Sequence, residues 1–389
     1  MQTFKLNADS SEGSGTLQNV LDVVRQGASS QNRVIYRHQQ LVEEKDKIVQ
    51  SNDSHRVSSS AILRLPTELL AKIFLNCVPE DRQRTPAPNL APVLLTTVCR
   101  RWREVAVDMT ILWRSLRVEV GHGDWQKKAF CYDSYLKRSR GHQLSLILEI
   151  RGDYRAEVKS LLQPYVDQVS SLSVELFPGA TSCPVVAADF SRLEELVMYM
   201  YLSGAVDTVA HSVAQLPPNI HSLKLVNVWL TFQELSDFNP LGWAGLTSLE
   251  IMVEGPHFFP CLLRLCPNLS SLTMIGTSTG AIERSETLKH TKLQTLRLYD
   301  LPFFETHADA ARILGLFNVV TLPNLQMVEV RNTGQWSHEE FKALLVRSQC
   351  PLERLVFGRG VMTTERQRAE YATLYPSLKV VTKPRLFRI

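Results

Sequence analysis

The sequence predicts an α + α/β protein in which a small helical unit precedes a solenoid of parallel strands. Two observations lead to this fold class. The pattern apolar-x-x-apolar-x-apolar occurs in eight copies between residues 169 and 357, and two short apolar helices are predicted within residues 61–118. A pattern repeated at this interval indicates units that stack on their neighbours, because one such unit alone cannot bury its own apolar face.

The composition is that of an ordinary globular chain with room for two or three units: 389 residues, 44% hydrophobic, 21% charged and a net charge of +4. Seven cysteines are scattered without a CxxC pair, so we expect free thiols in a reducing compartment. The N-terminus lacks an apolar signal region, and no run approaches the roughly 18 apolar residues of a membrane helix. We therefore expect a cytoplasmic or nuclear chain without membrane contact, metal or cofactor.

Residues 1–57 are predicted to form a polar N-terminal arm with a charged helix over about 31–50. Val34, Leu41 and Ile48 recur at heptad spacing, although His38 and Lys45 interrupt the row. This pattern is compatible with a weak coiled coil. A solvated helix or a disordered arm is the alternative.

The first helix of residues 61–118 is apolar on two faces. One row contains Leu65, Leu69, Ile73 and Cys77, and beside it lie Leu70 and Phe74. Pro66 suits the first helical turn, where its missing N–H costs nothing. A helix that is apolar on two faces requires two partners, so this segment is expected to associate with more than the next helix.

A second helix is predicted after a proline-rich loop at 79–92. Its apolar row comprises Leu95, Val98, Trp102, Val105 and Ala106, and Cys99 is expected within this helix as a packed thiol. The run Arg100–Arg103 lies on the other side, as a solvated face or, alternatively, a basic patch. About 55 residues bury little core alone, which again favours association.

The repeats indicate a solenoid over 144–382, opened by a strand at Leu144–Leu148 and followed by a basic tail at 383–389. The copies begin at Val169, Leu193, Ile220, Leu246, Leu269, Leu293, Leu325 and Leu352, 23 to 32 residues apart. Each copy predicts a short strand with its apolar residues pointing inward. Segments 231–238, 308–317 and 338–347 are predicted helices between strands.

This pattern resembles the leucine-rich repeat. The resemblance implies parallel strands on a concave face and helices or loops on a convex face. The copies are degenerate. In the usual repeat an Asn lies three residues after the last apolar strand position. Here Asn227, Asp300 and Asn332 lie two residues after it, and the other copies have neither Asn nor Asp there.

Residues 61–118 resemble an F-box, and more particularly the F-box-like proteins of mushroom-type fungi. The matching residues are Leu65, Pro66, Glu68, Leu69, Leu70, Ile73 and Phe74, then Val98, Cys99, Arg100, Trp102 and Arg103, with a trailing Ile111-Leu-Trp113. The resemblance implies a noncatalytic substrate receptor of an SCF-type ubiquitin ligase, docked on a Skp-type adaptor and through it on a cullin and a RING subunit. The implied adaptor-binding residues are Leu65, Pro66, Leu69, Leu70, Ile73, Phe74, Val98, Cys99, Trp102 and Val105.

The strand residues that do not point inward are predicted to line the concave face in columns. The middle column, from Ser173 to Val356, alternates in charge, which argues against nucleic acid. The next column offers a track for an unknown protein substrate, with Tyr199, Met252, Tyr299 and Arg331 as the predicted binding residues. Cover by a loop or by the C-terminal tail is the alternative.

No nucleotide-binding, metalloprotease or serine-hydrolase motif occurs in the sequence. Two other functions stay open. The chain could be a noncatalytic scaffold that uses the Skp adaptor without ubiquitin transfer, which a test for cullin would distinguish. It could also be a hydrolase on a repeat scaffold, whose sign would be a nucleophile–base pair in the folded structure.

Overall fold

The computed structural model describes residues 37, 39–45, 47, 65–78, 86, 91–121, 123–201, 206–253, 255, 257–276, 287–300 and 315–382. The chain divides into two compact units, Met1–Leu70 and Ala71–Ile389. In the first unit, residues 39–45 are helical with exposed side chains, within the charged helix expected over 31–50. The rest of the arm, most of the loop at 79–92 and the tail at 383–389 lie outside the described residues.

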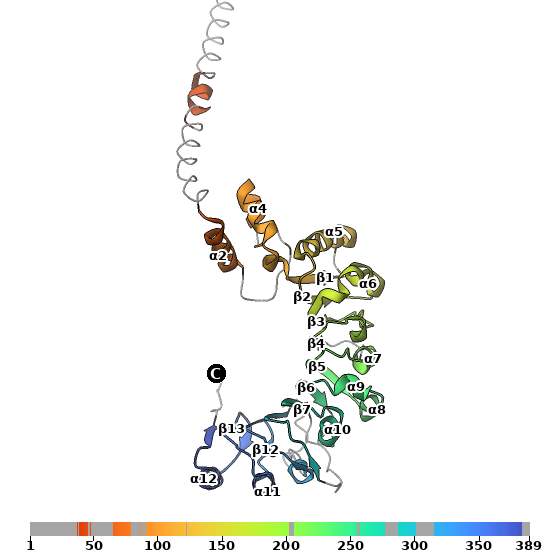
Figure 1. Cartoon of the computed structure of the whole chain (residues 1–389), viewed down its shortest axis with the longest axis vertical. Coiled ribbons are helices and arrows are strands. Elements are labelled where there is room, and N and C mark those ends of the chain that lie inside the picture. Colours follow the sequence, from red (N-terminus) through yellow and green to blue (C-terminus); the bar gives the residue numbers. More distant parts are fainter. Residues whose placement is uncertain are drawn as a thin grey trace, which may run out of the picture. The chain divides into compact units, whose positions relative to one another are not determined.

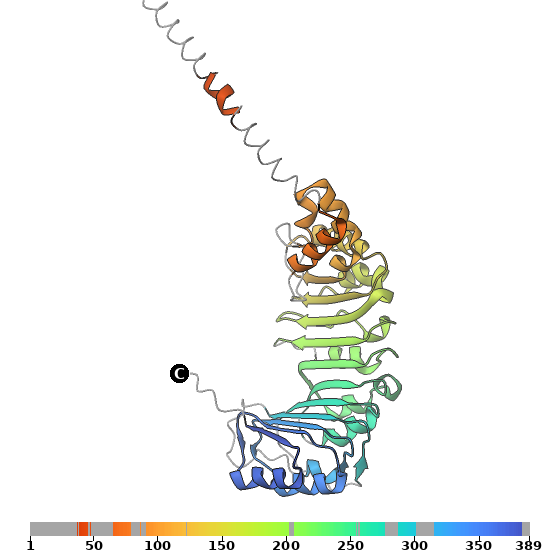
Figure 2. The same cartoon turned by 60° about the vertical axis from the view of Figure 1, so that its left-hand side comes forward.

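An eleven-stranded parallel sheet forms the framework of the second unit (Figure 2). Its strands, in spatial order, are Ser115–Val120 (β1), Leu144–Ile150 (β2), Val169–Leu176 (β3), Glu195–Met200 (β4), Ser222–Leu230 (β5), Ser248–Val253 (β6), Ser271–Gly276 (β7), Thr295–Asp300 (β9), Met327–Arg331 (β11), Arg354–Phe357 (β13) and Lys379–Thr382 (β15). Two small sheets pair Leu288–Lys289 (β8) with Val320–Thr321 (β10), and Gly334–Gln335 (β12) with Val361–Met362 (β14).

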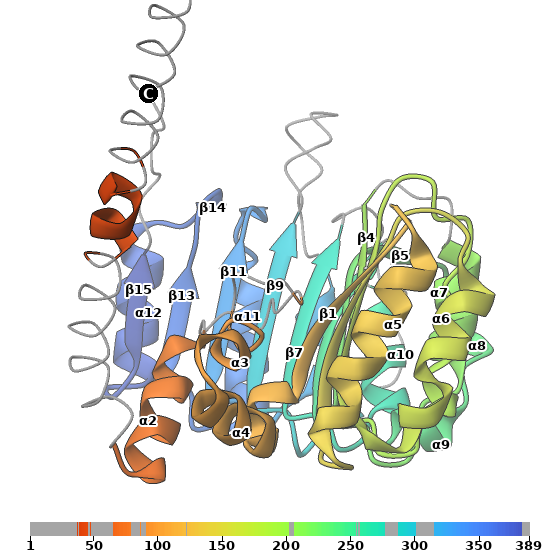
Figure 3. The ribbon, with the colours of Figure 1, turned by 90° about the horizontal axis from the view of Figure 1, so that it is seen from above.

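Helices follow most strands and lie on the outer face of the curved sheet (Figures 1 and 3). They are Trp125–Leu136 (α5), Arg155–Leu162 (α6), Val206–Ala214 (α7), Phe232–Ser236 (α8), Pro240–Trp243 (α9), Phe258–Leu265 (α10), His338–Ser348 (α11) and Glu365–Leu374 (α12). Short 3₁₀ turns occupy Thr110–Trp113 (η1), Lys137–Ser139 (η2), Gln163–Gln168 (η3), Ala187–Asp189 (η4) and Leu316–Val319 (η5). The predicted helices at 231–238 and 338–347 correspond to α8 and α11, whereas most of 308–317 lies outside the described residues.

The repeated apolar residues form the core between the sheet and the helices. All three apolar positions of all eight copies are buried, and none is more than 6% exposed. Burial of each such side chain contributes about 1.5–3 kcal/mol of transfer free energy. The pattern therefore predicts which face of each strand turns inward, and a long parallel sheet of the α/β solenoid type results.

The sheet begins one strand earlier than predicted. Strand β1 pairs in parallel with β2, with Leu116 beside Leu146 and Val118 beside Leu148. Its sequence follows the repeat pattern, because Trp113, Leu116 and Val118 occupy the apolar-x-x-apolar-x-apolar positions and all three are buried, but the solenoid was predicted to open only at Leu144. The helical segment and the sheet therefore share their boundary at residues 114–120, and the expected opening strand at Leu144 is the second.

Two asparagines beyond the strand cores adopt left-handed backbone conformations. Asn227 and Asn332 both have φ of 58°, a region that Asn tolerates better than most residues. The Asn332 side-chain amide donates to the carbonyl oxygen of Asp300 at 3.1 Å, which links neighbouring repeats. At Asn227 the β5–β6 register shifts between Lys224 and Trp229, so that Trp229 rather than Val226 pairs with Met252.

His290 is a buried histidine at the end of β8. The Leu293 N–H donates to its Nδ1 at 3.2 Å, so Nε2 carries the proton and donates to the Cys266 carbonyl at 3.1 Å. The side chain is 4% exposed, and this burial lowers the pKa of His290 below its usual value near 6.5. The folded chain therefore holds the neutral imidazole.

We expect the free energy of unfolding to decrease as pH falls below about 6.5, because the unfolded chain then binds a proton that folded His290 resists. The contribution is complete above the unfolded pKa and is lost as pH falls toward the lower folded pKa. Urea titrations at pH 7.5 and 5.5, on the wild type and on His290→Gln, measure it. An unchanged pH dependence in the variant would contradict this role.

Candidate functional site

Helix α2 (Thr67–Cys77) has one buried and one exposed apolar row. Leu70 and Phe74 are fully buried, and the Phe74 ring meets Trp102 edge-on with centroids 4.9 Å apart. Leu69 and Ile73 lie on an exposed row, with Ile73 39% exposed. Of the residues on this helix predicted to bind an adaptor, Leu70 and Phe74 are thus covered within the chain, whereas Leu69 and Ile73 are open.

The predicted second helix is two helices. Leu95–Val98 (α3) and Arg100–Asp108 (α4) are separated by Cys99, which is extended at φ −158° and ψ 171°. The run Thr96-Thr97-Val98 is β-branched and disfavours continuation, while Arg103 Nε donates to the freed Thr96 carbonyl at 2.8 Å. Cys99 is not a packed thiol within a helix: its Sγ accepts the Trp102 N–H at 3.4 Å and caps α4.

Trp113 connects this helical segment to the sheet. It is fully buried, its Nε1 donates to the Ala106 carbonyl at 2.8 Å, and its ring contacts Tyr135 with centroids 4.9 Å apart. The guanidinium of Arg138 covers the ring at 4.5 Å. The Trp113 ring therefore joins α4, α5 and the turn before β1 into one packed unit.

Large apolar side chains of the helical segment are left exposed. Of the predicted adaptor-binding residues, Pro66, Leu69, Ile73 and Val98 are exposed, and Leu65, Cys99, Trp102 and Val105 are half-buried. Val98 is 54% exposed. Leu75, Leu94 and Ile111 are also exposed and were not among the predicted adaptor-binding residues, although Ile111 belongs to the Ile111–Trp113 run that resembles the F-box. The helical segment therefore leaves several large apolar side chains uncovered.

Residues 62–119 match the family model described as F-box-like. This F-box-like domain contains α2, α3, α4 and η1 and ends within β1. F-box domains generally bind Skp-type adaptors, and the domain indicates a role in binding an adaptor of the SCF type. No curated protein matches the chain.

Beyond the F-box-like domain, two of the predicted target-binding residues lie together on the concave face. The Arg331 guanidinium covers the Tyr299 ring at 4.6 Å, and Arg331 also donates to Glu329 Oε1 at 2.6 Å. Hydrogen bonding to Glu329 raises the pKa of Arg331. Gly358 leaves the space that Arg331 occupies, since a Cβ there would lie 2.5 Å from Arg331 Cγ.

The other two residues are placed differently. Tyr199 lies in an aromatic cluster at the ends of β3 and β4: its ring centroid is 6.3 Å from that of Tyr201, which in turn stacks on Phe177 at 4.7 Å. Met252 is 3% exposed, and its Sδ accepts the Asn227 N–H at 2.8 Å. Met252 is thus covered within the chain, and Tyr199 on β4 and Tyr299 on β9 lie on strands that β5, β6 and β7 separate.

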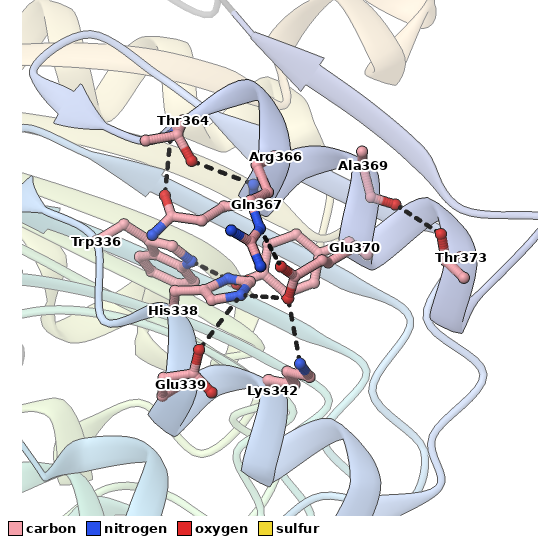
Figure 4. Close-up of polar contacts among 11 residues, drawn as sticks. Trp336, His338, Glu339, Lys342, Thr364, Arg366, Gln367, Ala369, Glu370 and Thr373 are labelled. Atoms are coloured by element: carbon pink, nitrogen blue, oxygen red, sulfur yellow. Dashed lines mark hydrogen bonds and ion pairs between the residues drawn. The ribbon is translucent and has the colours of Figure 1, made fainter.

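A buried polar chain, not predicted from the sequence, holds α11 and α12 together (Figure 4). Trp336 Nε1 donates to the Tyr371 hydroxyl at 2.7 Å, which leaves that hydroxyl to donate to His338 Nδ1 at 2.8 Å. His338 Nε2 then donates to Glu370 Oε2 at 3.0 Å. Burial raises the pKa of Tyr371, and the hydrogen bond from His338 lowers the pKa of Glu370.

Within the described ranges, no group of three or more His, Cys, Asp or Glu side chains is placed to hold a metal ion. None of the helices that the structure describes is both long and apolar enough to cross a membrane.

Proposed function

We propose that the chain is a noncatalytic substrate receptor of an SCF-type ubiquitin ligase. In this proposal the F-box-like domain docks on a Skp-type adaptor, which a cullin and a RING subunit carry, and the sheet, as a degenerate leucine-rich-repeat solenoid, binds a target protein. The observation that carries the proposal is the set of exposed apolar side chains on the F-box-like domain, Ile73 and Val98 among them. Ubiquitin transfer belongs to the partners, and this chain supplies proximity.

Physical considerations support this division of labour. A stable docking interface buries about 1,600 Å² in total, with a few large side chains providing most of the affinity. The curved sheet carries a separate face on β1 to β15, away from its covering helices (Figure 3). All seven cysteines are free thiols, which supports a cytoplasmic or nuclear location within the proposal.

Replacement of Ile73 and Val98 together by Asp is expected to abolish capture of a co-expressed Skp-type adaptor in a pull-down. Two charges placed at these exposed apolar positions would have to be desolvated in the interface, at a cost of several kcal/mol, while the folded chain alone tolerates them. Circular dichroism and the melting temperature check that the variant is folded.

The matched control replaces Leu241 and Val346, which are 84% and 61% exposed on the sheet's covering helices, by Asp. This control should keep the adaptor. Failure of the wild type to capture any Skp-type adaptor would refute the proposal. Recovery of the adaptor without a cullin, and without ubiquitin on a bound target, would favour the scaffold alternative.

A further inference from the structure

The concave side of the last four strands of the large sheet is strongly basic. Along β9, β11, β13 and β15 the inward positions are apolar, so the alternate side chains face the concave side. The charged residues among them are Arg297, Arg331, Arg354, Lys379 and Glu329. Four cations and one carboxylate give this surface a net charge of +3.

The single carboxylate is buried beneath the cations. Glu329 has 7% of its side chain exposed, whereas Arg331 has 42% and Arg297 has 32%. Glu329 accepts two hydrogen bonds from Arg331 and forms an ion pair with Arg297 at 3.7 Å, while Arg297 Nη1 donates to Ser271 Oγ at 3.3 Å. Both guanidinium groups stay partly open to solvent. A planar guanidinium held in this way is suited to binding a carboxylate in a bidentate manner.

The other two cations have no counter-charge. Arg354 and Lys379 are exposed neighbours on β13 and β15, and neither has an ion pair or a side-chain hydrogen bond with another described residue. The nearest acidic side chain on the concave side, toward β7 and β6, is Glu250, which pairs with Lys224 at 2.9 Å. Strand β7 contributes no charge on this side, with Ser271, Thr273 and Ile275. The middle column alone, with its alternating signs, did not reveal this basic surface.

We propose that the concave face of β9, β11, β13 and β15 binds an acidic segment of a protein, in which Asp or Glu side chains meet Arg297, Arg331, Arg354 and Lys379. The inference rests on the proposed function and specifies the chemistry of the target. Four strands about 4.8 Å apart span roughly 15 Å, the length of about five extended residues. Apolar Met327 lies beside Arg354, and Val381 follows Lys379 on the same side of β15, so both suit apolar side chains next to the acidic ones.

Charge also distinguishes this occupant from two others. The C-terminal tail carries Lys383, Arg385 and Arg388 and no acid, so this basic surface would repel it. Nucleic acid needs either many phosphate contacts or open aromatic rings for stacking. The one aromatic ring on this surface, Tyr299, is already covered by Arg331.

The test measures binding of a fluorescein-labelled ten-residue peptide, in which Glu and Asp alternate with Leu and Ser, to the full chain by anisotropy. The variant R354E/K379E reverses two exposed cations that have no ion pair or side-chain hydrogen bond with another described residue. We expect it to weaken peptide binding at least tenfold at low salt, because attraction becomes repulsion. The matched control, K159E/R192E, makes the same change in net charge at exposed positions outside this surface and should change binding less than twofold.

Two further probes decide between occupants. A peptide with Lys at the acidic positions should not bind, and a labelled single-stranded oligonucleotide of ten bases should bind more weakly than the acidic peptide. Equal loss in both charge-reversal variants, or tighter binding of the oligonucleotide, would overturn the proposal. The sequence segment 301–314 carries two acids of its own, Glu305 and Asp309. Peptide binding by E305Q/D309N but not by the wild type would overturn the proposal in favour of cover by this segment. Capture of a Skp-type adaptor by R354E/K379E is measured separately. If the peptide test fails while the adaptor is still captured, the result counts against the acidic-segment proposal and not against the ubiquitin-ligase proposal.

Discussion

Replacement of Trp113 by Ala is expected to lower the free energy of unfolding by about 3–5 kcal/mol, the largest effect of any single change considered. The indole is fully buried, contacts Tyr135 and donates a hydrogen bond to the Ala106 carbonyl. Its removal leaves a cavity where α4 and α5 meet the turn into β1, and an unpaired carbonyl. Chemical denaturation of the purified chain, followed by tryptophan fluorescence and circular dichroism, measures the loss.

The control for Trp113 is Phe130→Ala on α5. Phe130 is an aromatic residue of the same region, but it is 73% exposed, so its loss should change the free energy of unfolding by less than about 0.5 kcal/mol. Similar losses in the two variants would show that Trp113 does not connect the F-box-like domain to the sheet in the way its contacts indicate.

Replacement of Tyr371 by Phe is expected to destabilise the chain by roughly 2–4 kcal/mol, although it removes one oxygen atom. The hydroxyl accepts from Trp336 Nε1 and donates to His338 Nδ1, and both rings are at least nine-tenths buried. Without it, a buried donor and a buried acceptor lose their partners, and each unsatisfied group costs about 1–3 kcal/mol. Thermal and urea unfolding of the variant measure the effect.

Tyr375→Phe is the matched control, because the Tyr375 hydroxyl donates to the Leu345 carbonyl at 3.2 Å and contacts the Cys350 thiol in a partly exposed position, where water can replace it. Its loss should cost about 1 kcal/mol or less. If the two side chains form one network, adding His338→Phe to the Tyr371→Phe variant should lower the free energy of unfolding by much less than His338→Phe does in the wild type. Full additivity would contradict the network.

Some features were accessible from the sequence because they arise from local periodicity. The apolar positions of the eight copies, such as Leu223 and Leu296, repeat at fixed spacing, and a strand has only two faces, so burial of one face follows. The two apolar rows of α2 are similarly local, since Leu69 and Leu70 must lie on different sides of one helix. The spacing alone could not show which of the two rows is covered by the rest of the chain and which stays exposed.

The sequence by itself determined the order of the units, the inward face of each strand and the F-box-like segment, because each depends on residues a few positions apart. The tertiary structure alone decided the burial of Met252, the Trp336–Tyr371–His338 chain and the basic surface on β9 to β15. Each of these depends on residues brought together from distant positions: His338 and Tyr371 are 33 residues apart, and Arg297 meets Glu329 only through strand register. Such contacts leave no periodic trace in the chain.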